Sequence, residues 1–432
     1  MNINIITLGC SKNTVDSENL AGVLRAAGHK VYFDRQKNDC DVVVVNTCGF
    51  IGDAKEESIN MLLGLIAVNN RGRKKCRIIA CGCLVQRYRD ELAKEMPEVD
   101  GWFGTDEWDK ISETIRNKEN KHDLGTLCPR PLSTPSHYAY LKISEGCNRS
   151  CSYCAIPLIR GPHRSRPMDE IVSEARQLVL SGVKELIVIA QDTTYYGLDI
   201  YHHRALGELL NRLATESGAP WIRLHYTYPT SFPEDAIDAI ARHANICNYI
   251  DIPLQHINTR LLTSMQRGID RDGTLRLLEN FRTKLPDVAI RTTLIVGYPG
   301  ETLSEFAELK EFVRTARFDR MGCFAYSPEE GTPAERLGDP VPQEEKERRV
   351  GELMAIQEGI SLEINQARVG RSYRCIVDRR EGEYLVARTE YDSPEVDDEV
   401  LIRQTRAAIR PGDFVQVRIT QAMENDLLGE LE

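Results

Sequence analysis

Cys147-Asn-Arg-Ser-Cys151-Ser-Tyr-Cys154 places three thiols within eight residues, directly after an apolar run, Tyr138 to Ile143, that is typical of a β-strand. Three cysteines can hold three corners of a cubane iron–sulfur cluster and leave the fourth iron open to another ligand. A structural zinc site needs four protein ligands, and the nearest candidates for a fourth are Cys128 and His163. The spacing favours an iron–sulfur site, because zinc would require one of these two residues to fold back.

The composition describes an ordinary globular chain with several domains. Its 432 residues can bury two or three separate cores, and contents of 41% hydrophobic and 28% charged residues are typical. The start lacks the pattern of a signal peptide, and no apolar run is long enough to span a bilayer. Thirteen cysteines in such a chain indicate a reducing compartment. We therefore expect a cytoplasmic metalloprotein that does not bind membranes. A net charge of −10 argues against a polyanion-binding surface over the whole molecule.

Residues 1–118 alternate short apolar strands with amphipathic helices, a pattern that predicts a parallel sheet covered by helices. The expected strands are 3–8, 41–46 and 77–80, and the expected helices are 15–27, 56–68 and 84–95.

Each of these three strands ends at a cysteine with a glycine close by: Leu8-Gly9-Cys10, Asn46-Thr47-Cys48-Gly49 and Ala80-Cys81-Gly82-Cys83. If the strands are neighbours, their carboxyl ends converge, and three thiols meet at one edge of the sheet. The pattern favours a second metal cluster, although free cysteine is also a common small core residue. Spacing alone does not choose between Cys81 and Cys83.

These motifs resemble those of the radical S-adenosylmethionine (SAM) methylthiotransferases. The first loop, with Tyr153 directly before its last cysteine, is similar to the cluster loop of radical SAM enzymes. Leu8-Gly-Cys-Ser-Lys-Asn, Asn46-Thr-Cys-Gly-Phe-Ile and Gly82-Cys83-Leu are similar to the three cluster motifs of the methylthiotransferase amino-terminal domain. The resemblance implies two [4Fe-4S] clusters, whose ligands would be Cys147, Cys151 and Cys154 for one and Cys10, Cys48 and Cys83 for the other.

Residues 137–366 follow a polar linker, 119–136, that contains three prolines. Six strand-like runs recur in this region with helices between them: 138–143, 185–190, 222–226, 249–252, 290–296 and 320–326. This periodicity predicts an α/β domain, and the resemblance implies a partial (β/α)6 TIM-like barrel with its active residues at the carboxyl ends of the strands.

Several residues of these strands are candidates for contact with SAM. Asp192 follows the second strand and could bind ribose hydroxyls or the methionyl ammonium group, or it could cap a helix. Gly297 and Gly300 follow the fifth strand and are similar to an adenine-side loop, or they form a turn before a helix. Arg291 lies inside that strand and needs an anionic partner, such as a carboxylate of the cofactor or substrate.

Three arginines follow the first cysteine loop in the segment Arg160-Gly-Pro-His-Arg164-Ser-Arg166. No acidic residue separates them. They could bind a carboxylate or phosphate, or form a solvated basic loop.

In residues 367–432 the pattern changes to short runs in which apolar and polar residues alternate. Such runs predict a small antiparallel β-barrel, and this part of the chain resembles the TRAM module. The segment from Gly370 to Glu432 contains fourteen acidic and nine basic residues, and Glu390 to Glu399 alone contains six acids. A nucleic-acid surface should be basic, so direct nucleic-acid binding through this domain is not expected. The acidic run instead predicts attraction of a basic protein, or it is a solvated acidic loop.

The resemblance covers nearly the whole chain. Val15-Asp-Ser-Glu, the run that continues from Cys147 to His163, and Tyr391-Asp-Ser-Pro-Glu-Val-Asp are similar to the branch that methylthiolates an aspartate β-carbon in small-subunit ribosomal protein twelve. This branch implies SAM as cofactor and methyl donor, with that ribosomal protein as partner. A reducing electron donor, such as a flavodoxin or ferredoxin, and a sulfur donor would also be needed. Two alternatives remain, namely a tRNA adenosine methylthiotransferase and a noncatalytic iron–sulfur carrier.

Overall fold

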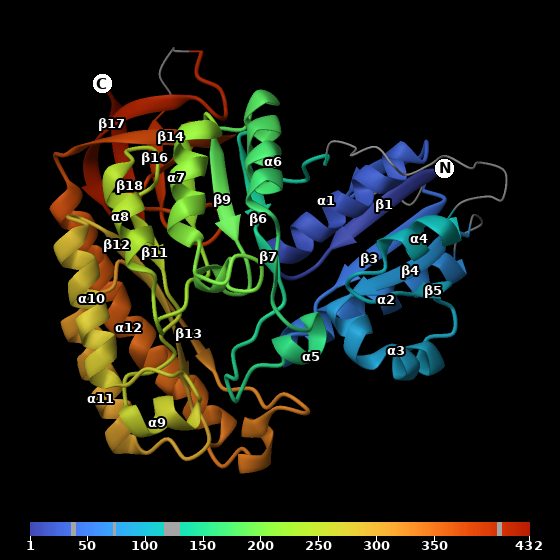
Figure 1. Ribbon diagram of the computed structural model, residues 1–432, viewed down its shortest axis with the longest axis horizontal. Coiled ribbons are helices and arrows are strands. Elements are labelled where there is room, and N and C mark those ends of the chain that lie inside the picture. Colours follow the sequence, from blue (N-terminus) through green and yellow to red (C-terminus); the bar gives the residue numbers. More distant parts are fainter. Residues whose placement is uncertain (36–39, 72–74, 116–129, 404–407) are drawn as a thin grey trace. The chain divides into compact units, whose positions relative to one another are not determined.

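A computed structural model describes residues 1–35, 40–71, 75–115, 130–403 and 408–432 (Figure 1). The contacts divide the chain into two compact units. The first unit comprises residues 1–134, 146–148 and 155–162, and the second comprises 135–145, 149–154 and 163–432. The part of the expected linker at 116–129 lies outside the described residues. No helix in the described ranges is long and apolar enough to cross a membrane.

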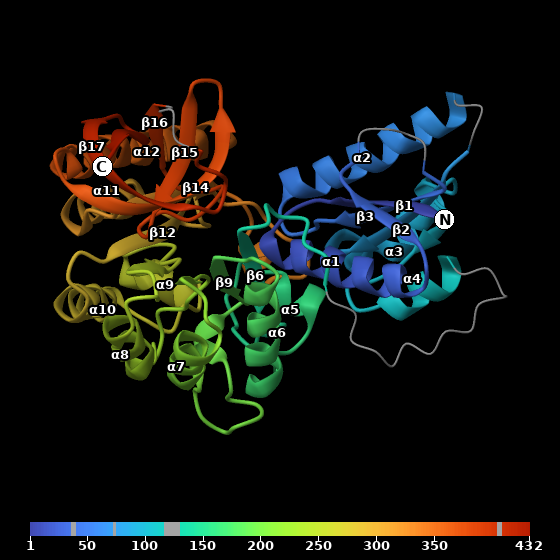
Figure 2. The same ribbon diagram turned by 90° about the horizontal axis from the view of Figure 1, so that it is seen from above.

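The first unit is built on a five-stranded parallel sheet in the order β2-β1-β3-β4-β5. The strands are β1 (Asn2–Thr7), β2 (Lys30–Phe33), β3 (Val42–Thr47), β4 (Arg77–Gly82) and β5 (Gly101–Trp102). Helices α1 (Ser11–Ala26) and α4 (Trp108–Ile115) pack on one face of the sheet. Helices α2 (Gly52–Arg71) and α3 (Cys83–Glu95) pack on the other face (Figure 2).

Burial explains the sequence of β3. Valines 42–45 are all buried because both faces of the central strand are covered by helices. The three expected strands and three expected helices of this region are confirmed within a few residues, and β1, β3 and β4 are neighbours in the sheet. Strands β2 and β5 and helix α4 were not predicted.

The second unit contains the six expected strands of the partial barrel: β6 (Tyr138–Lys142), β9 (Glu185–Ile189), β10 (Trp221–Leu224), β11 (Tyr249–Asp251), β12 (Ala289–Val296) and β13 (Arg320–Ala325). They form two parallel three-stranded sheets, in the orders β10-β9-β6 and β11-β12-β13. A parallel bridge between Ile222 and Ile246 joins the two sheets next to β10 and β11, so all six strands form one open series.

Helices follow these strands along the chain, as the (β/α) pattern requires (Figure 1). They are α6 (Met168–Leu180), α7 (Leu206–Glu216), α8 (Glu234–Arg242), α9 (Thr259–Ser264), α10 (Arg271–Lys284), α11 (Leu303–Ala316) and α12 (Gln343–Arg368). Four short elements also belong to this unit: β7 (Ser144–Glu145), β8 (Arg164–Ser165), η1 (Thr193–Tyr195) and η2 (Pro333–Leu337). The short helix α5 (Ile156–Arg160) belongs to the first unit.

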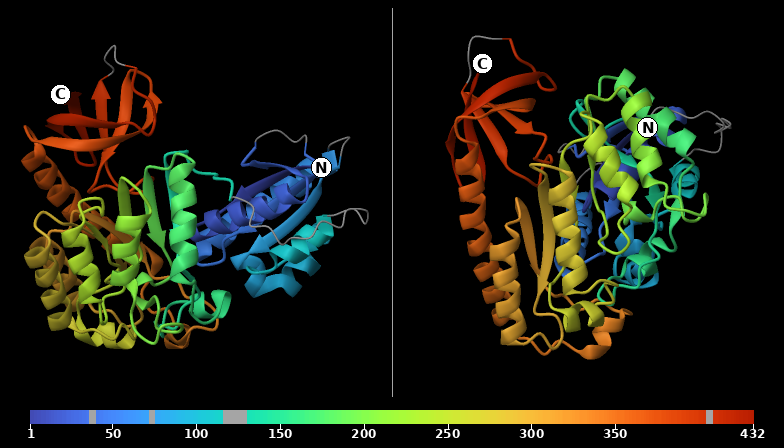
Figure 3. Two further views of the ribbon diagram at one scale, coloured as in Figure 1. Left: turned by 45° about the horizontal axis from the view of Figure 1, so that its top comes forward. Right: turned by 60° about the vertical axis from the view of Figure 1, so that its left-hand side comes forward.

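The last part of the chain is a closed five-stranded barrel in the order β14-β15-β16-β18-β17. Its strands are β14 (Ser372–Glu381), β15 (Tyr384–Thr389), β16 (Glu399–Arg403), β17 (Phe414–Ala422) and β18 (Asp426–Leu431). Figure 3 shows the long helix α12 leading into this barrel. The expected small antiparallel barrel is confirmed, except that β16 and the unpredicted β18 run parallel.

The acid-rich run between β15 and β16 covers the amino-terminal end of the partial barrel. Its contacts are with residues at or near the starts of strands. Arg320, the first residue of β13, binds Asp392 at 2.5 Å and Asp398 at 3.1 Å. Tyr249, the first residue of β11, donates to Asp397 at 2.7 Å. The hydroxyl of Tyr138, the first residue of β6, donates to Glu395 at 2.8 Å.

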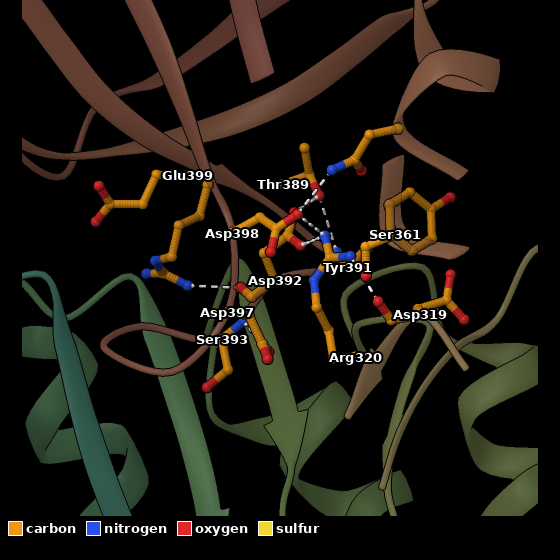
Figure 4. A network of polar contacts seen from close by, with 12 residues as sticks. Asp319, Arg320, Ser361, Thr389, Tyr391, Asp392, Ser393, Asp397, Asp398 and Glu399 are labelled. Atoms are coloured by element: carbon orange, nitrogen blue, oxygen red, sulfur yellow. Dashed lines mark hydrogen bonds and ion pairs between the residues drawn. The ribbon is translucent and has the colours of Figure 1, made fainter. Parts of the chain in front are cut away.

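This arrangement removes three of the six acids of the run from the expected docking surface for a basic protein, whereas Glu395 is exposed. The side chains of Asp392, Asp397 and Asp398 are at most 9% exposed. Figure 4 shows Asp392 and Asp398 turned toward Arg320, beneath the strands of the last barrel. These acids neutralise buried arginines and are not available to attract a partner from solution.

Candidate functional site

The three cysteines of the first unit lie at the carboxyl ends of neighbouring strands. Cys10 follows β1 and precedes α1, Cys48 follows β3, and Cys83 begins α3 directly after β4. Cys48 and Cys83 are 7% and 5% exposed, whereas Cys10 is exposed. The sheet order therefore brings together the thiols that the sequence predicted to converge.

The glycines beside these cysteines allow the strand ends to approach. A Cβ on Gly9, where φ is +94°, would lie 2.7 Å from Cβ and 2.8 Å from Sγ of Cys48. A Cβ on Gly49 would lie 2.6 Å from Cα of Leu84, and one on Gly82 would collide with Asn46. Any side chain at these three positions would force the cysteine-bearing segments apart, so glycine is required here for close backbone approach.

The donor chemistry of this edge suits a cluster of iron and sulfur. Burial raises the pKa of Cys83 to about 12, and the neighbouring thiols of Cys10 and Cys48 raise it further while Arg160 opposes the change. Burial also raises the pKa of Cys48. Buried thiols that repel one another as anions gain most from a cationic metal centre, which binds them as thiolates. The residues present therefore fit a cluster held by three cysteines.

Cys81 has a different environment from Cys83. It lies 5% exposed in the apolar core between the sheet and helices α1 and α4, with Ile79 and Leu20 in the same core. Burial raises the pKa of Cys81 to about 12, and Asp16 is the second cause. Cys83 instead packs with Ala155 and Ile159 of the segment that follows the other cysteine loop.

Arg160 is a site residue that sequence reasoning did not single out from the basic loop. Its side chain is 2% exposed, and Nη1 forms an ion pair of 2.6 Å with Asp16. Nη2 donates to Asn13 Oδ1 at 2.6 Å and to Cys83 Sγ at 3.2 Å. Both Asp16 and Asn13 lie on α1, which starts directly after Cys10. The sequence offered one signal, the Val15-Asp-Ser-Glu motif that includes Asp16.

The loop that carries Cys147, Cys151 and Cys154 contributes to both units. Cys147 is part of the first unit, where its backbone amide donates to the carbonyl of Gly161 at 3.1 Å. Cys151 and Cys154 belong to the second unit and are joined by a turn in which the amide of Cys154 donates to the carbonyl of Cys151 at 3.1 Å.

Cys151 is surrounded by polar and aromatic groups. Its Sγ lies 3.4 Å from Nη1 of Arg267 and 3.4 Å from the hydroxyl of Tyr228. Arg267 also donates to the hydroxyl of Tyr153 at 3.1 Å, and the ring of Tyr153 packs beside Tyr298 and Tyr326. The guanidinium of Arg267 thus places a positive charge beside the sulfur that a metal would bind.

Asp192 caps η1, which is one of the two roles that the sequence predicted for it. Its Oδ1 accepts from the amide of Thr194 at 2.9 Å, and its Oδ2 binds Nε of Arg149 at 2.7 Å. Arg149 lies within the cysteine loop, so Asp192 anchors that loop to the end of β9.

Gly297 and Gly300 form a turn after β12, and both have positive φ. The amide of Gly297 donates to Glu301, whose carboxylate also binds Nη1 of Arg349 on α12 at 2.7 Å. A Cβ on Gly297 would collide with the stem of Lys346, so α12 packs directly against this turn. At Gly300 a Cβ would meet nothing closer than 3.9 Å.

The anionic partner of Arg291 comes from the chain itself. Its guanidinium binds Asp251 at 3.1 Å and Asp397 at 3.2 Å. The expected need for a carboxylate of cofactor or substrate is therefore met by two aspartates, one of them from the acid-rich run.

No group of three His, Cys, Asp or Glu side chains among the described residues is arranged to hold a single metal ion. A cubane cluster has a different requirement, because each cysteine ligates its own iron atom. The cysteines that hold such a cluster therefore need not converge on one point.

Three family profiles match successive parts of the chain. The uncharacterized protein family UPF0004 matches residues 2–104, the radical SAM superfamily matches 141–313, and the TRAM domain matches 369–431.

Relatives of known name match nearly the whole chain. A protein of Flavobacterium johnsoniae is 52% identical over 429 residues, which cover 99% of this chain and 97% of the relative. A protein of Flavobacterium psychrophilum is 53% identical over 428 residues, with 99% and 97% covered, and one of Bacteroides thetaiotaomicron is 50% identical over 430 residues, with 99% and 98% covered. Each of the three is named ribosomal protein uS12 methylthiotransferase RimO.

Among solved structures, the radical SAM methyltransferase TsrM of Kitasatospora setae matches with a TM-score of 0.54 and 15% identity, over 89% of this chain and 80% of that one. The radical SAM enzyme OxsB matches with a TM-score of 0.51 and 11% identity, over 83% of this chain and 56% of that one. At these identities the likeness supports the fold alone.

Proposed function

The chain belongs to the family of ribosomal protein uS12 methylthiotransferases named RimO, and from this premise we propose that it adds a methylthio group to the β-carbon of one aspartate of uS12, the small-subunit ribosomal protein twelve. It is a transferase of the radical SAM superfamily. The observation that carries this proposal is the identity of 50–53% to RimO proteins over 99% of the chain, which includes all three domains and both cysteine sets.

The reaction explains why two cysteine sets are needed. SAM and two [4Fe-4S] clusters supply the radical that removes hydrogen from an unactivated C–H bond, as well as the sulfur and the methyl group that replace it. The chain itself binds these groups, orients them and excludes water. Three cysteines at each cluster leave one iron open in each, and this open iron is a functional requirement rather than a missing ligand.

We assign the cluster ligands to two sets of three cysteines. Cys147, Cys151 and Cys154 hold the cluster that binds SAM, and Cys10, Cys48 and Cys83 hold the cluster that carries the sulfur. The second assignment is supported by the neighbouring strands β1, β3 and β4 and by the three glycines that permit their close approach.

Contacts with SAM outside the cysteines are proposed at the turns that follow the barrel strands. Tyr153 presents its hydroxyl beside Cys151 through Arg267. Asp192 fixes the cysteine loop through Arg149. In the turn that contains Gly297 and Gly300, Gly300 has open space where a side chain would lie, whereas Gly297 is buried against the stem of Lys346. Arg291 is withdrawn from this set, because it is already paired with Asp251 and Asp397.

The domain division that fits this function is 1–118 for the amino-terminal cluster domain, 119–136 for a linker, 137–366 for the radical SAM barrel and 367–432 for the TRAM-like barrel. The family matches at 2–104, 141–313 and 369–431 fall inside these limits.

The reaction also requires a reducing electron donor, such as a flavodoxin or ferredoxin, and a sulfur donor. Because uS12, free or in the ribosomal subunit, is a ribosomal protein, we propose that the enzyme acts in the cytoplasm.

Mass spectrometry of uS12 tests the function. In cells that lack this chain, uS12 should be lighter by the mass difference between a methylthio group and the hydrogen that it replaces. Expression of the chain should restore the heavier form. Unmodified uS12 in both strains, together with methylthioadenosine in the tRNA of the expressing strain only, would overturn the proposal in favour of a tRNA-modifying enzyme.

A further inference from the structure

Arg160 occupies an unusual position for a buried charge. It ends helix α5, six residues after Cys154, yet its side chain binds Asp16, Asn13 and Cys83 of the amino-terminal cluster domain. The guanidinium forms an ion pair with Asp16 and donates hydrogen bonds to Asn13 Oδ1 and Cys83 Sγ. A loop that begins with the ligands of one cluster thus delivers a positive charge to a ligand of the other.

The position of this charge is fixed by the ends of two further strands. The carboxamide nitrogen of Asn13 donates to the carbonyl of Leu8 at 2.8 Å and to the carbonyl of Thr47 at 3.2 Å. Leu8 follows β1 and Thr47 ends β3, directly before Cys48. The carboxamide oxygen of Asn13 accepts from Arg160. The guanidinium is therefore oriented by the same backbone that carries Cys10 and Cys48.

A purely structural ion pair does not account for this arrangement. A buried pair has a desolvation cost that offsets much of its attraction, and packed apolar residues often stabilise a fold as well. The pair of Arg160 and Asp16 satisfies one end of the guanidinium and leaves the other end to donate to a thiol. Donors to cysteine sulfur and nearby charge are two of the means by which proteins set the potential of an iron–sulfur cluster.

We propose that Arg160 is a positioning residue that orients Cys83 and raises the reduction potential of the amino-terminal cluster, with Asp16 limiting that effect. The proposal rests on the assignment of Cys10, Cys48 and Cys83 as ligands. Reduction adds negative charge to the cluster and its thiolates, and a guanidinium that donates to Cys83 stabilises the reduced form more than the oxidised form. The carboxylate of Asp16 acts in the opposite direction.

The test uses the full chain with Cys147, Cys151 and Cys154 all replaced by alanine, so that only the amino-terminal cluster is bound after anaerobic reconstitution. A redox titration followed by electron paramagnetic resonance gives the midpoint potential. Arg160→Gln should shift the equilibrium toward the oxidised cluster roughly tenfold, about 59 mV for one electron. Arg160→Lys keeps the charge and should recover part of the shift. Asp16→Asn should shift the potential in the opposite direction.

Arg166→Gln is the matched control. Arg166 lies in the same basic run but binds Glu174 and the carbonyl of Lys142 in the second unit. It should leave the potential unchanged. If Arg160 had a merely structural role, the midpoint potentials of Arg160→Gln and Asp16→Asn would shift in the same direction or would both stay at the value of the starting protein. Either result overturns the proposal.

The outcome separates this proposal from the function on which it rests. Opposite shifts in Arg160→Gln and Asp16→Asn, with no methylthio group on uS12 after incubation with the unaltered chain, would uphold the role of Arg160 and refute the function. Absence of iron from the triple-alanine background would refute both the ligand assignment and the role of Arg160.

Discussion

Cys81 and Cys83 are separated by one glycine, but they face different surroundings. Cys81 is the last side chain of β4 to enter the apolar core beneath α1, while Cys83 begins α3 and meets Arg160. Spacing could not distinguish them, because either thiol follows the strand closely enough to reach its carboxyl edge. Cys81 is buried among aliphatic side chains, whereas Cys83 accepts a hydrogen bond from the guanidinium of Arg160. This difference supports Cys83 as the ligand.

Alanine at each position should therefore have separate effects. Cys81→Ala should cost about 1 kcal/mol of stability through a small cavity and retain the iron of both clusters. Cys83→Ala should lose the iron of the amino-terminal cluster. Iron analysis after anaerobic reconstitution, combined with chemical denaturation, measures both effects. Retained iron in Cys83→Ala together with loss in Cys81→Ala would reverse the assignment.

Asp398 is the residue for which we expect a dependence on pH. Burial raises its pKa to about 7 from an ordinary value of 3.8, in spite of the ion pair with Arg320 at 3.1 Å. The pair does not prevent the rise, because Arg320 also binds Asp392, which repels the charge on Asp398. One guanidinium is insufficient for two buried carboxylates.

The sign of the pH effect follows from the direction of the shift. The folded chain binds a proton at Asp398 more tightly than the unfolded chain, so this contribution to stability is complete below about pH 4 and is lost as the pH rises through about 7. Asp398→Asn remains neutral throughout. The variant should therefore show a smaller decrease in the free energy of unfolding between pH 5 and pH 8 than the unaltered chain. An equal or larger decrease in the variant would contradict this pKa.

At the scale of elements, the connection between β15 and β16 fixes the last barrel onto the partial barrel. Glu185, the first residue of β9, binds Arg388 of β15 at 2.8 Å and Arg223 of β10 at 2.7 Å. Arg388 also forms an ion pair of 2.6 Å with Asp378 of β14. Together with the contacts of Asp392 and Asp398, these ion pairs join the last barrel to the starts of strands β9 and β13 within the second unit. The cysteine loop lies at the opposite, carboxyl ends of the strands, as ligand sites in such barrels do.

Removing one partner of this buried network should be costly. Arg320→Met leaves Asp392 and Asp398 without their cation and should lower the free energy of unfolding by about 3–5 kcal/mol. Arg403→Met is the control, because the pair of Arg403 and Glu383 spans 3.3 Å with side chains 76% and 60% exposed. The control should change stability by less than about 1 kcal/mol. Similar losses in both variants, measured by urea denaturation of the full chain, would show that burial of the network does not determine its contribution.

At the scale of the whole molecule, the sequence predicted the three kinds of fold because most of their longer strands are strongly patterned. Strands β6, β9 and β12 contain runs of three or four consecutive apolar residues, whereas β10 and β11 have only two in succession. Strand β5 has two residues and α4 has eight, so neither shows a clear period. Strand β18, with the sequence Asp-Leu-Leu-Gly-Glu-Leu, lacks strict alternation and pairs parallel with β16.

The candidate site could be predicted only where the chemistry is local in the sequence. Three cysteines in eight residues, and cysteines at the ends of strands, are visible without a structure. The partners of Arg160 and Arg291 are not, because Asp16 and Asp397 are 144 and 106 residues away. The same limit explains the error over the acid-rich run, since net charge does not reveal that Arg320 and Arg291 neutralise its aspartates. The case against a tRNA substrate therefore rests on the named relatives and not on the charge of the last barrel.

The content of iron per chain tests the central claim most directly, namely that two separate clusters are each held by three cysteines. After anaerobic reconstitution the unaltered chain should bind about eight iron atoms, as two [4Fe-4S] clusters require. Replacement of Cys10, Cys48 and Cys83 by alanine should leave about four, and replacement of Cys147, Cys151 and Cys154 should also leave about four. Full iron content in either triple variant, or loss of all iron in either, would contradict the account.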